Sequence, residues 1–159
     1  MPALERTLIL LKPDCVQRGL IGRVLARFED KGLRIVGLQM RRFSRELLEE
    51  HYSVHRSKPF FSKLVGYMGS GPVVAIALEG LDAIEVTRGL IGATNSRKAL
   101  PGTIRGDFGM SFSNNLVHGS DGKESATKEL GLFFGGKGEI VEWTPADLEW
   151  VYSAAEELA

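Results

Sequence analysis

The chain has 159 residues, of which 43% are hydrophobic and 25% charged, and this predicts a globular protein with a sizeable core. Basic and acidic residues number 20 each, and the resulting absence of net charge argues against a protein that coats nucleic acid. The one cysteine, Cys15, excludes a disulfide framework, and no apolar run reaches the length of a membrane span. We therefore expect a cytoplasmic protein with a single domain over residues 1–159.

Hydrophobic periodicity predicts alternating strands and helices along the chain. Val73–Leu78 has no polar face, which predicts a central strand. Residues 94–109 show no periodicity, and a long loop of this kind inside a compact domain is usually functional. Ser44 and Pro59 are expected at the starts of helices. In chain order, the expected elements are strand 7–11, helix 20–31, strand 33–43, helices 44–52 and 59–68, strand 73–78, helix 82–91, strand 110–117, a helix that begins at Ser120 or Asp121, and a last helix from Thr144 through Ala155.

This order of elements fits a βαββαβ core, which is the ferredoxin-like arrangement. It is an α+β fold with an antiparallel four-stranded sheet, here with additional helices. The helices are expected to cover one face of the sheet. The other face would then need a partner or a polar surface.

His118 carries the strongest functional signal, because Gly119, Ser120 and Asp121 follow it directly. Glycine allows a tight turn and the next two residues are good helix caps, so the imidazole is expected where a strand leads into a helix. The free N–H groups of a helix start attract phosphate. A histidine there is either a structural residue or a nucleophile, and Glu129, two helical turns further on, offers a carboxylate to orient it.

Several basic and hydroxyl side chains are candidates for a phosphate site. Arg88 falls on an apolar helix stripe, where it either reaches solvent from the core edge or binds an anion. Thr94 and Arg105 lie beyond that helix, and two arginines with a hydroxyl would make a polyphosphate clamp. Asn115 could reach into the site of His118. Lys12, at a strand end, is expected to be solvated on pattern alone.

Aromatic and histidine side chains give weaker signals. Phe60 is expected in the core, although a ring at a helix start can also stack on a base. Tyr52 and His55 are spaced to share a face, for which a surface role is the simplest interpretation, and His51 is expected on a helix surface. No cluster of histidines and cysteines indicates a bound transition metal.

The segment Asn115–Asp121 resembles the active-site signature of nucleoside diphosphate kinases. The resemblance extends over nearly the whole chain, and the other matching segments follow in the family's order and spacing. These segments are Thr7–Asp14, Arg18–Gly22, His51–Tyr52, Lys58–Phe61, Ser70–Ala75 and Pro101–Asp107.

The resemblance implies a ping-pong reaction. His118 would take the γ-phosphoryl group of a nucleoside triphosphate, mainly ATP, and pass it to a nucleoside diphosphate. Mg²⁺ would arrive on the nucleotide phosphates rather than in a cage of protein ligands. The implied positions are Lys12 and Asn115 at the sugar, with Lys12 also near the γ-phosphate; Phe60, Leu64 and Phe112 around the base; Arg88, Thr94, Arg105 and His55 at the phosphates; Tyr52 and Ser120 beside the reacting group; and Glu129 as the residue that orients His118.

Phosphoryl transfer needs positioning and charge neutralisation, which this set of residues would supply. Imidazole must be neutral to attack, so we expect activity to fall below a pH of about 6.5. A non-catalytic nucleotide- or partner-binding module on the same fold is the alternative function. That alternative predicts loss of His118 or of the arginine clamp.

Three positions depart from the family's usual pattern. Phe112 stands where a smaller aliphatic residue is common, Ser96 stands where many members have proline, and the turn at residues 135–138 is unusual. Family members form hexamers or tetramers. The long C-terminal helix expected after Trp143 favours a hexameric homo-oligomer here.

Overall fold

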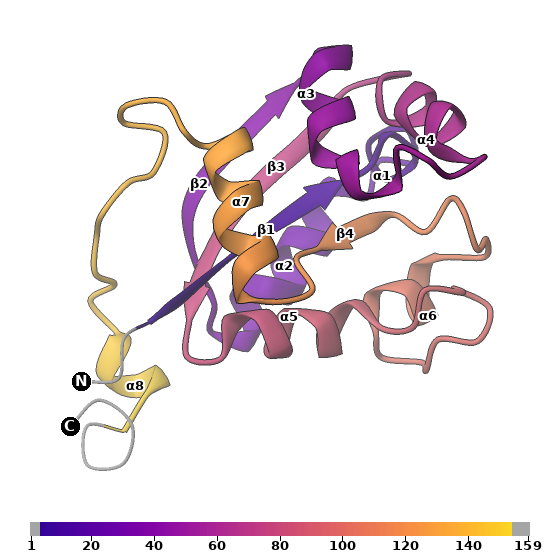
Figure 1. Cartoon of the computed structure of the whole chain (residues 1–159). Coiled ribbons are helices and arrows are strands. Elements are labelled where there is room, and N and C mark those ends of the chain that lie inside the picture. Colours follow the sequence, from indigo (N-terminus) through magenta and orange to yellow (C-terminus); the bar gives the residue numbers. More distant parts are fainter. Residues whose placement is uncertain (1–3, 154–159) are drawn as a thin grey trace.

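The structure is a computed structural model that describes residues 4–153 (Figure 1). Strands and short helices alternate along the chain, as periodicity predicts. The strands are β1 (Glu5–Leu11), β2 (Arg34–Arg41), β3 (Val73–Gly80) and β4 (Val117–Gly119). The helices are α1 (Pro13–Gln17), α2 (Ile21–Lys31), α3 (Arg45–His51), the 3₁₀ turn η1 (Ser53–His55), α4 (Phe61–Met68), α5 (Ala83–Ile91), α6 (Ile104–Phe108), α7 (Lys123–Phe133) and α8 (Leu148–Val151).

The four strands form one sheet in the order β2-β3-β1-β4, and every pairing in it is antiparallel. β1 lies between β3 and β4, so that Ile9 pairs with Ile76 on one side and with Gly119 on the other. β3 is buried along its whole length, as expected for a strand without a polar face. This strand order, with α2 and α5 as crossovers, confirms the ferredoxin-like α+β fold.

Helices cover both faces of the sheet, so the expectation of one uncovered face is wrong. Ile9 and Leu11 point into a core that includes residues of α1, α2 and α5. Leu8 and Leu10 point into a second core with residues of α3, α4 and α7. Figure 1 shows α3 and α7 on the near side of the sheet and α2 behind it. The additional helices therefore supply a second apolar layer instead of leaving a face for a partner.

The segment before His118 is a loop that leads into a three-residue strand, and the expected strand 110–117 is wrong. Leu116 has a left-handed backbone, with φ at 72°, which a regular strand cannot contain. Such a conformation costs a non-glycine residue roughly 1–3 kcal/mol. Asp14 accepts a hydrogen bond from the Leu116 N–H at 3.0 Å, and the Lys12 N–H donates to the Leu116 carbonyl at 2.8 Å. The residues that directly follow β1 thus hold this turn in place.

Two helix boundaries and one additional short helix also differ from expectation. Pro59 lies before α4, which begins at Phe61. The N-cap of α7 is Gly122 rather than Ser120 or Asp121, because the Ser120 hydroxyl is already hydrogen-bonded within the core. The loop 94–109 contains α6, a short helix that periodicity did not reveal.

The last helix is much shorter than expected in the part of the chain that the structure describes. α8 spans one turn, so the long helix from Thr144, and the support it gave to a hexamer, are wrong for residues up to 153. Ala155 lies outside the described residues. Among residues 4–153 there is also no helix with the length and apolar character needed to cross a membrane.

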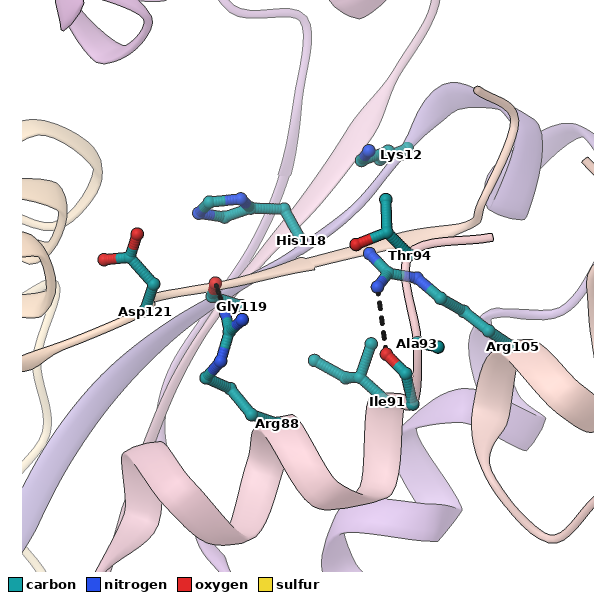
Figure 2. A pocket seen from close by; sticks show the side chains of 10 residues that line it. Lys12, Arg88, Ile91, Ala93, Thr94, Arg105, His118, Gly119 and Asp121 are labelled. Carbon is teal, nitrogen blue, oxygen red and sulfur yellow. Dashed lines mark hydrogen bonds between the residues drawn. The ribbon is translucent and has the colours of Figure 1, made fainter. Parts of the chain in front are cut away.

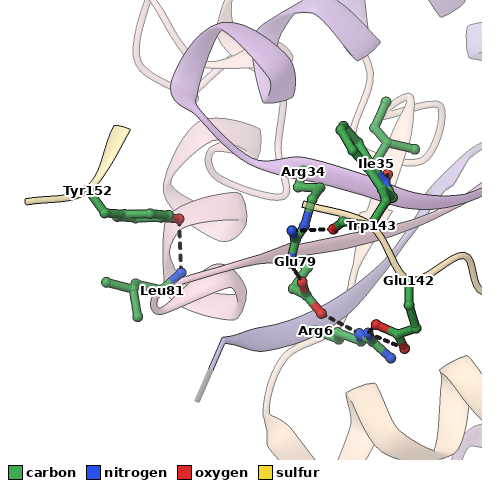
Figure 3. A network of polar contacts seen from close by, with 8 residues as sticks. All are labelled: Arg6, Arg34, Ile35, Glu79, Leu81, Glu142, Trp143 and Tyr152. Carbon is green, nitrogen blue, oxygen red and sulfur yellow. Dashed lines mark hydrogen bonds and ion pairs between the residues drawn. The ribbon is translucent and has the colours of Figure 1, made fainter. Parts of the chain in front are cut away.

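Polar contacts attach the C-terminal segment to the sheet (Figure 3). Arg6 on β1 lies 2.6 Å from both Glu79 on β3 and Glu142, and Arg34 on β2 also contacts Glu79. The Tyr152 hydroxyl accepts a hydrogen bond from the Leu81 N–H at 3.1 Å. The segment is therefore fixed on the sheet by charged side chains rather than by a long helix.

Candidate active site

A pocket of about 330 Å³ lies beside β4 and the C-terminal end of α5 (Figure 2). Its cationic side chains come from three separate segments, with Lys12 after β1, Arg88 on α5 and Arg105 on α6. The remaining lining residues are 91–94, His118, Gly119 and Asp121. The first turn of α7 is not part of the lining. Side-chain charges, and not the helix start expected near His118, therefore make this pocket attractive to an anion.

His118 lies in the middle of β4, where it pairs with Leu10 of β1. Its side chain is 25% exposed and reaches the pocket. Nε2 lies 2.7 Å from Oε2 of Glu129, a distance typical of a charge-assisted hydrogen bond. Because a carboxylate only accepts, the proton belongs on Nε2 and the lone pair on Nδ1 is left free. Nδ1 can then attack an electrophile in the pocket.

Glu129 is held from two sides. Its Oε1 accepts a hydrogen bond from the buried Ser120 hydroxyl at 2.7 Å, and that hydroxyl in turn accepts from the Leu8 N–H at 3.3 Å. Burial alone would raise the pKa of Glu129, but the hydrogen bonds from His118 and Ser120 and the neighbouring imidazoles bring it below its ordinary value. The carboxylate is therefore ionised at neutral pH and can stabilise positive charge on the His118 ring.

The two arginines of the expected clamp meet at this pocket (Figure 2). Arg88 is exposed and lies on the pocket side of α5 rather than in an apolar stripe, with its guanidinium 3.5 Å from the Gly119 carbonyl. Burial, followed by the charge of Arg88, lowers the pKa of Arg105 to about 10, so the Arg105 guanidinium is still charged at neutral pH. Arg105 donates at 2.6–3.1 Å to three backbone carbonyls, those of Gly92, Asn115 and Val117.

Lys12 and Asn115 form a polar pair at the edge of the pocket. Nζ of Lys12 donates to Oδ1 of Asn115 at 2.8 Å, and Nδ2 of Asn115 donates to the Thr94 carbonyl at 3.1 Å. Burial, and then the charge of Arg105, lower the pKa of Lys12 to about 8, although Asp14 opposes the shift. Lys12 is therefore not the solvated strand-end lysine that its pattern predicts. A bound anion would favour its charged form.

The aromatic candidates lie outside the lining of this pocket. Phe60 is 48% exposed at the start of α4, with its ring centroid 5.4 Å from that of His55, so it is not a core residue. Phe112 is 59% exposed in the loop before β4. Both rings are open to a planar ligand. Leu64 packs against the second core. Tyr52 is buried in that core, so the surface position that its spacing suggested is wrong.

His51 is the residue that sequence reasoning missed. It was expected on a helix surface, but its side chain is only 2% exposed. Its ring packs edge-on against that of His118, with centroids 5.0 Å apart and planes at 89°. The signal was present in the sequence, because His51 follows Leu47 and Leu48 at the spacing of one helix face.

Relatives with known names match nearly the whole chain. The sequence pattern of the family described as nucleoside diphosphate kinase matches residues 5–138. A nucleoside diphosphate kinase of Archaeoglobus fulgidus is 55% identical over 149 residues, which cover 94% of this chain and 98% of the relative. The chain belongs to the nucleoside diphosphate kinase family. It is an enzyme that transfers phosphoryl groups between nucleotides.

Other nucleoside diphosphate kinases agree in sequence and in fold. A Drosophila melanogaster nucleoside diphosphate kinase is 52% identical over 148 residues, which cover 93% of this chain and 96% of the relative. The halophilic nucleoside diphosphate kinase of Halobacterium salinarum, solved in complex with CDP, has a TM-score of 0.89 and 48% identity, and the match covers 93% of this chain and 98% of that one. A non-catalytic module is not favoured, because His118 and both clamp arginines are present.

One cluster of side chains in this nucleoside diphosphate kinase has donor atoms close enough together to be considered as a metal site. Ligand atoms of His51, His118 and Glu129 lie within 4.8 Å of one another, which sequence spacing did not reveal. Two imidazoles and one carboxylate do not suit Mg²⁺, which prefers six oxygen ligands. Within the lining of the pocket, Asp121 is the one carboxylate. A magnesium ion there would need the phosphate oxygens of the nucleotide.

Proposed function

We propose that this family member works by a ping-pong mechanism in which His118 carries the phosphoryl group. One observation supports it above the others. The 2.7 Å contact between Nε2 and Glu129 leaves Nδ1 unprotonated at a pocket that Lys12, Arg88 and Arg105 also line. A neutral nucleophile is not repelled by the negative charge of a polyphosphate, and the three cations would offset that charge.

In the first half-reaction, Nδ1 of His118 forms a bond to the γ-phosphorus of a nucleoside triphosphate. The bond to the β–γ bridging oxygen breaks, and the nucleoside diphosphate leaves with that electron pair. The proton on Nε2 stays in its hydrogen bond to Glu129, which stabilises the positive ring. In the second half-reaction, a terminal oxygen of another diphosphate attacks the same phosphorus and the N–P bond breaks.

The remaining candidates bind and orient the nucleotide. Arg88, Thr94, Arg105 and His55 hold the phosphates, with Mg²⁺ bound to the phosphate oxygens. Lys12 and Asn115 contact the sugar, and Lys12 also neutralises charge at the γ-phosphate. The base stacks on Phe60, with Leu64 and Phe112 beside it, and stacking of this kind discriminates little between bases. Tyr52 and Ser120 close the inner side of the site, and Ser120 acts through Glu129.

The proposal extends to the assembly and the compartment. We place the protein in the cytoplasm as one domain over residues 1–159 that forms a homo-oligomer, with a hexamer preferred to a tetramer. More than half of each of Leu38, Met40 and Val141 is exposed near the β2 edge, which supports self-association. Light scattering on the purified protein should give six times the mass of the chain, and a monomeric mass would contradict the assembly.

Steady-state kinetics test the mechanism. Initial rates at varied ATP and several fixed GDP concentrations should give parallel double-reciprocal lines, because the first product leaves before the second substrate binds. Labelled phosphate should also exchange between ATP and ADP without any other nucleotide. Intersecting lines together with no exchange would exclude a phosphoryl-enzyme intermediate and favour direct transfer in a ternary complex.

A further inference from the structure

His51 lies directly behind His118, and the phosphotransfer steps above give it no role. It is the last residue of α3, and neither of its ring nitrogens has a hydrogen-bond partner in the part of the chain that the structure describes. A buried imidazole without partners costs free energy, and a phenylalanine would fill the same space without that cost. The nitrogens of His51 therefore need an explanation beyond packing.

Aromatic contacts hold the His51 ring in one orientation. Its centroid lies 4.4 Å from that of Tyr52 and 5.2 Å from that of Phe133, in addition to the edge contact with His118. Rotation of a histidine ring about its terminal torsion has only broad preferences of its own. The plane of the His118 ring must therefore be set by its neighbours, and His51 is one of them.

The second contact of His51 is with Glu129. Nδ1 of His51 lies 3.6 Å from Oε2, the same oxygen that accepts from Nε2 of His118 at 2.7 Å. A carboxylate oxygen has room for two donors, and 3.6 Å is just beyond hydrogen-bond range. A small shift of Glu129 would let His51 donate as well.

The charge state of His51 suits this place. Burial, and then the charge of His118, lower the pKa of His51 to about 3; Glu129 opposes this, while Lys128 and Lys12 add to it. His51 is thus neutral at physiological pH and does not compete with His118 for the Glu129 charge. A transition metal among the three side chains is disfavoured, because the short His118–Glu129 contact occupies Oε2 and Lys12 lines the same pocket.

We propose that His51 is a positioning residue. Its ring fixes the plane of the His118 imidazole, and its Nδ1–H supports Oε2 of Glu129, so that Nδ1 of His118 is presented to the phosphate pocket. This inference rests on the proposed function, because it takes His118 as the nucleophile.

Two variants separate the nitrogen from the ring. His51→Phe keeps an aromatic ring without a donor, whereas His51→Asn keeps an amide N–H close to the position of Nδ1. We expect His51→Phe to slow phosphorylation of His118 by γ-labelled ATP, in a single turnover, by about 10- to 100-fold, the range typical of residues that orient a metal-ligating histidine. His51→Asn should keep more of the rate than His51→Phe. ADP affinity should change in neither, because the clamp is untouched.

The matched control is Phe43→Leu, which alters the same core at a ring 4.8 Å from Phe133, away from His118. It should lower the melting temperature but leave the phosphorylation rate of folded protein unchanged. Nitrogen NMR of the His118 ring gives a second readout. The Nε2–H tautomer should dominate in the wild type and in Phe43→Leu, and both tautomers should be populated in His51→Phe.

A wild-type rate and tautomer in His51→Phe would overturn the proposal, as would an equal loss of rate in Phe43→Leu. The proposed function fails in a different way, since the wild type itself would then acquire no label on His118.

Discussion

Oε2 of Glu129 lies 2.7 Å from Nε2 of His118 and 3.6 Å from Nδ1 of His51, while Oε1 accepts from Ser120. In the proposed mechanism, one carboxylate thus sets the tautomer of His118 and stabilises the charge that N–P bond formation would place on its ring. Ser120 ties this carboxylate to the backbone of β1. We therefore expect the proposed chemistry at His118 to depend on side chains that lie behind it, away from the phosphate pocket.

Glu129→Gln tests this dependence, because the amide has the same shape without the charge. We expect kcat to fall by roughly 10²- to 10⁴-fold, as for other carboxylates that orient a catalytic histidine, with little change in KM. Glu124→Gln is the matched control, since Glu124 is an exposed carboxylate in the first turn of α7. Equal activity of the two variants would show that the Glu129 charge is not used.

Lys12 predicts a pH dependence of nucleotide binding. Its pKa is about 8, so the free protein loses this positive charge as pH rises through 8. Affinity for ADP should be highest below pH 8 and fall by up to about tenfold per pH unit above it. Calorimetry between pH 7 and 9 measures this. Lys12→Arg keeps its charge over that range and should give a flatter curve, and identical curves would remove Lys12 from the explanation.

At the residue scale, the sequence predicted which side chains gather at the candidate site better than it predicted their burial and their partners. The segment Asn115–Asp121 and the arginines identified residues that the fold brings together. The burial of His51 and the fixed Lys12–Asn115 pair depend on packing between α3, α7 and β1, which one sequence does not display. Residue type alone favoured the surface for His51 and Lys12.

At the scale of elements, α6 is the short helix that positions Arg105. The Thr103 hydroxyl caps it by accepting from the Gly106 N–H at 3.0 Å and donates to the Leu100 carbonyl at 2.7 Å. A five-residue helix gains little from its own hydrogen bonds, so the cap matters more than usual. The candidate site thus depends on α6 through Arg105, which lies earlier in the chain than His118.

Thr103→Ala should therefore affect both stability and binding. Loss of a side-chain cap costs about 0.5–2 kcal/mol, and fraying of α6 should raise KM for nucleotides while kcat changes less. Thr127→Ala is the comparison, because that exposed hydroxyl on α7 also donates to a backbone carbonyl, that of Lys123, at 3.0 Å but caps no helix. A similar KM for both variants would show that the cap does not position Arg105.

Elements with strong periodicity could be predicted from sequence, and irregular ones could not. β1, α2, β3 and α5 lie within a few residues of their expected positions. α6 is too short to show a period. β4 was misplaced because the left-handed backbone of Leu116 keeps the preceding residues out of the strand. Such a turn is stabilised by Asp14 and Lys12, more than 100 residues earlier in the chain, so local sequence does not reveal it.

At the scale of the whole molecule, the sheet carries an apolar layer on each face, and the candidate site lies beside the edge strand β4. The expectation of a single covered face is wrong because the additional helices α3, α4 and α7 pack on the face opposite α2 and α5. Burial of His51 in the second layer links the folding of the molecule to pH.

The pKa of His51 is about 3 in the folded protein against 6.5 for an ordinary histidine. Between these values the unfolded chain binds a proton that the folded chain does not, so stability falls as pH drops from about 6.5 toward 3. The contribution is about 1.4 kcal/mol per pH unit. Urea unfolding at several pH values gives the free energy of unfolding as a function of pH. Between pH 6.5 and 3 this free energy should change less steeply with pH for His51→Phe than for the wild type. An equal pH dependence would mean that His51 is protonated in the fold.

The most direct measurement of the central claim is transfer of label to His118. Protein incubated with γ-labelled ATP should acquire an acid-labile, base-stable label that maps to His118, and GDP should remove it as labelled GTP. His118→Ala should acquire none while keeping its fold. A folded wild-type protein that transfers phosphate without any label on His118 would contradict the account.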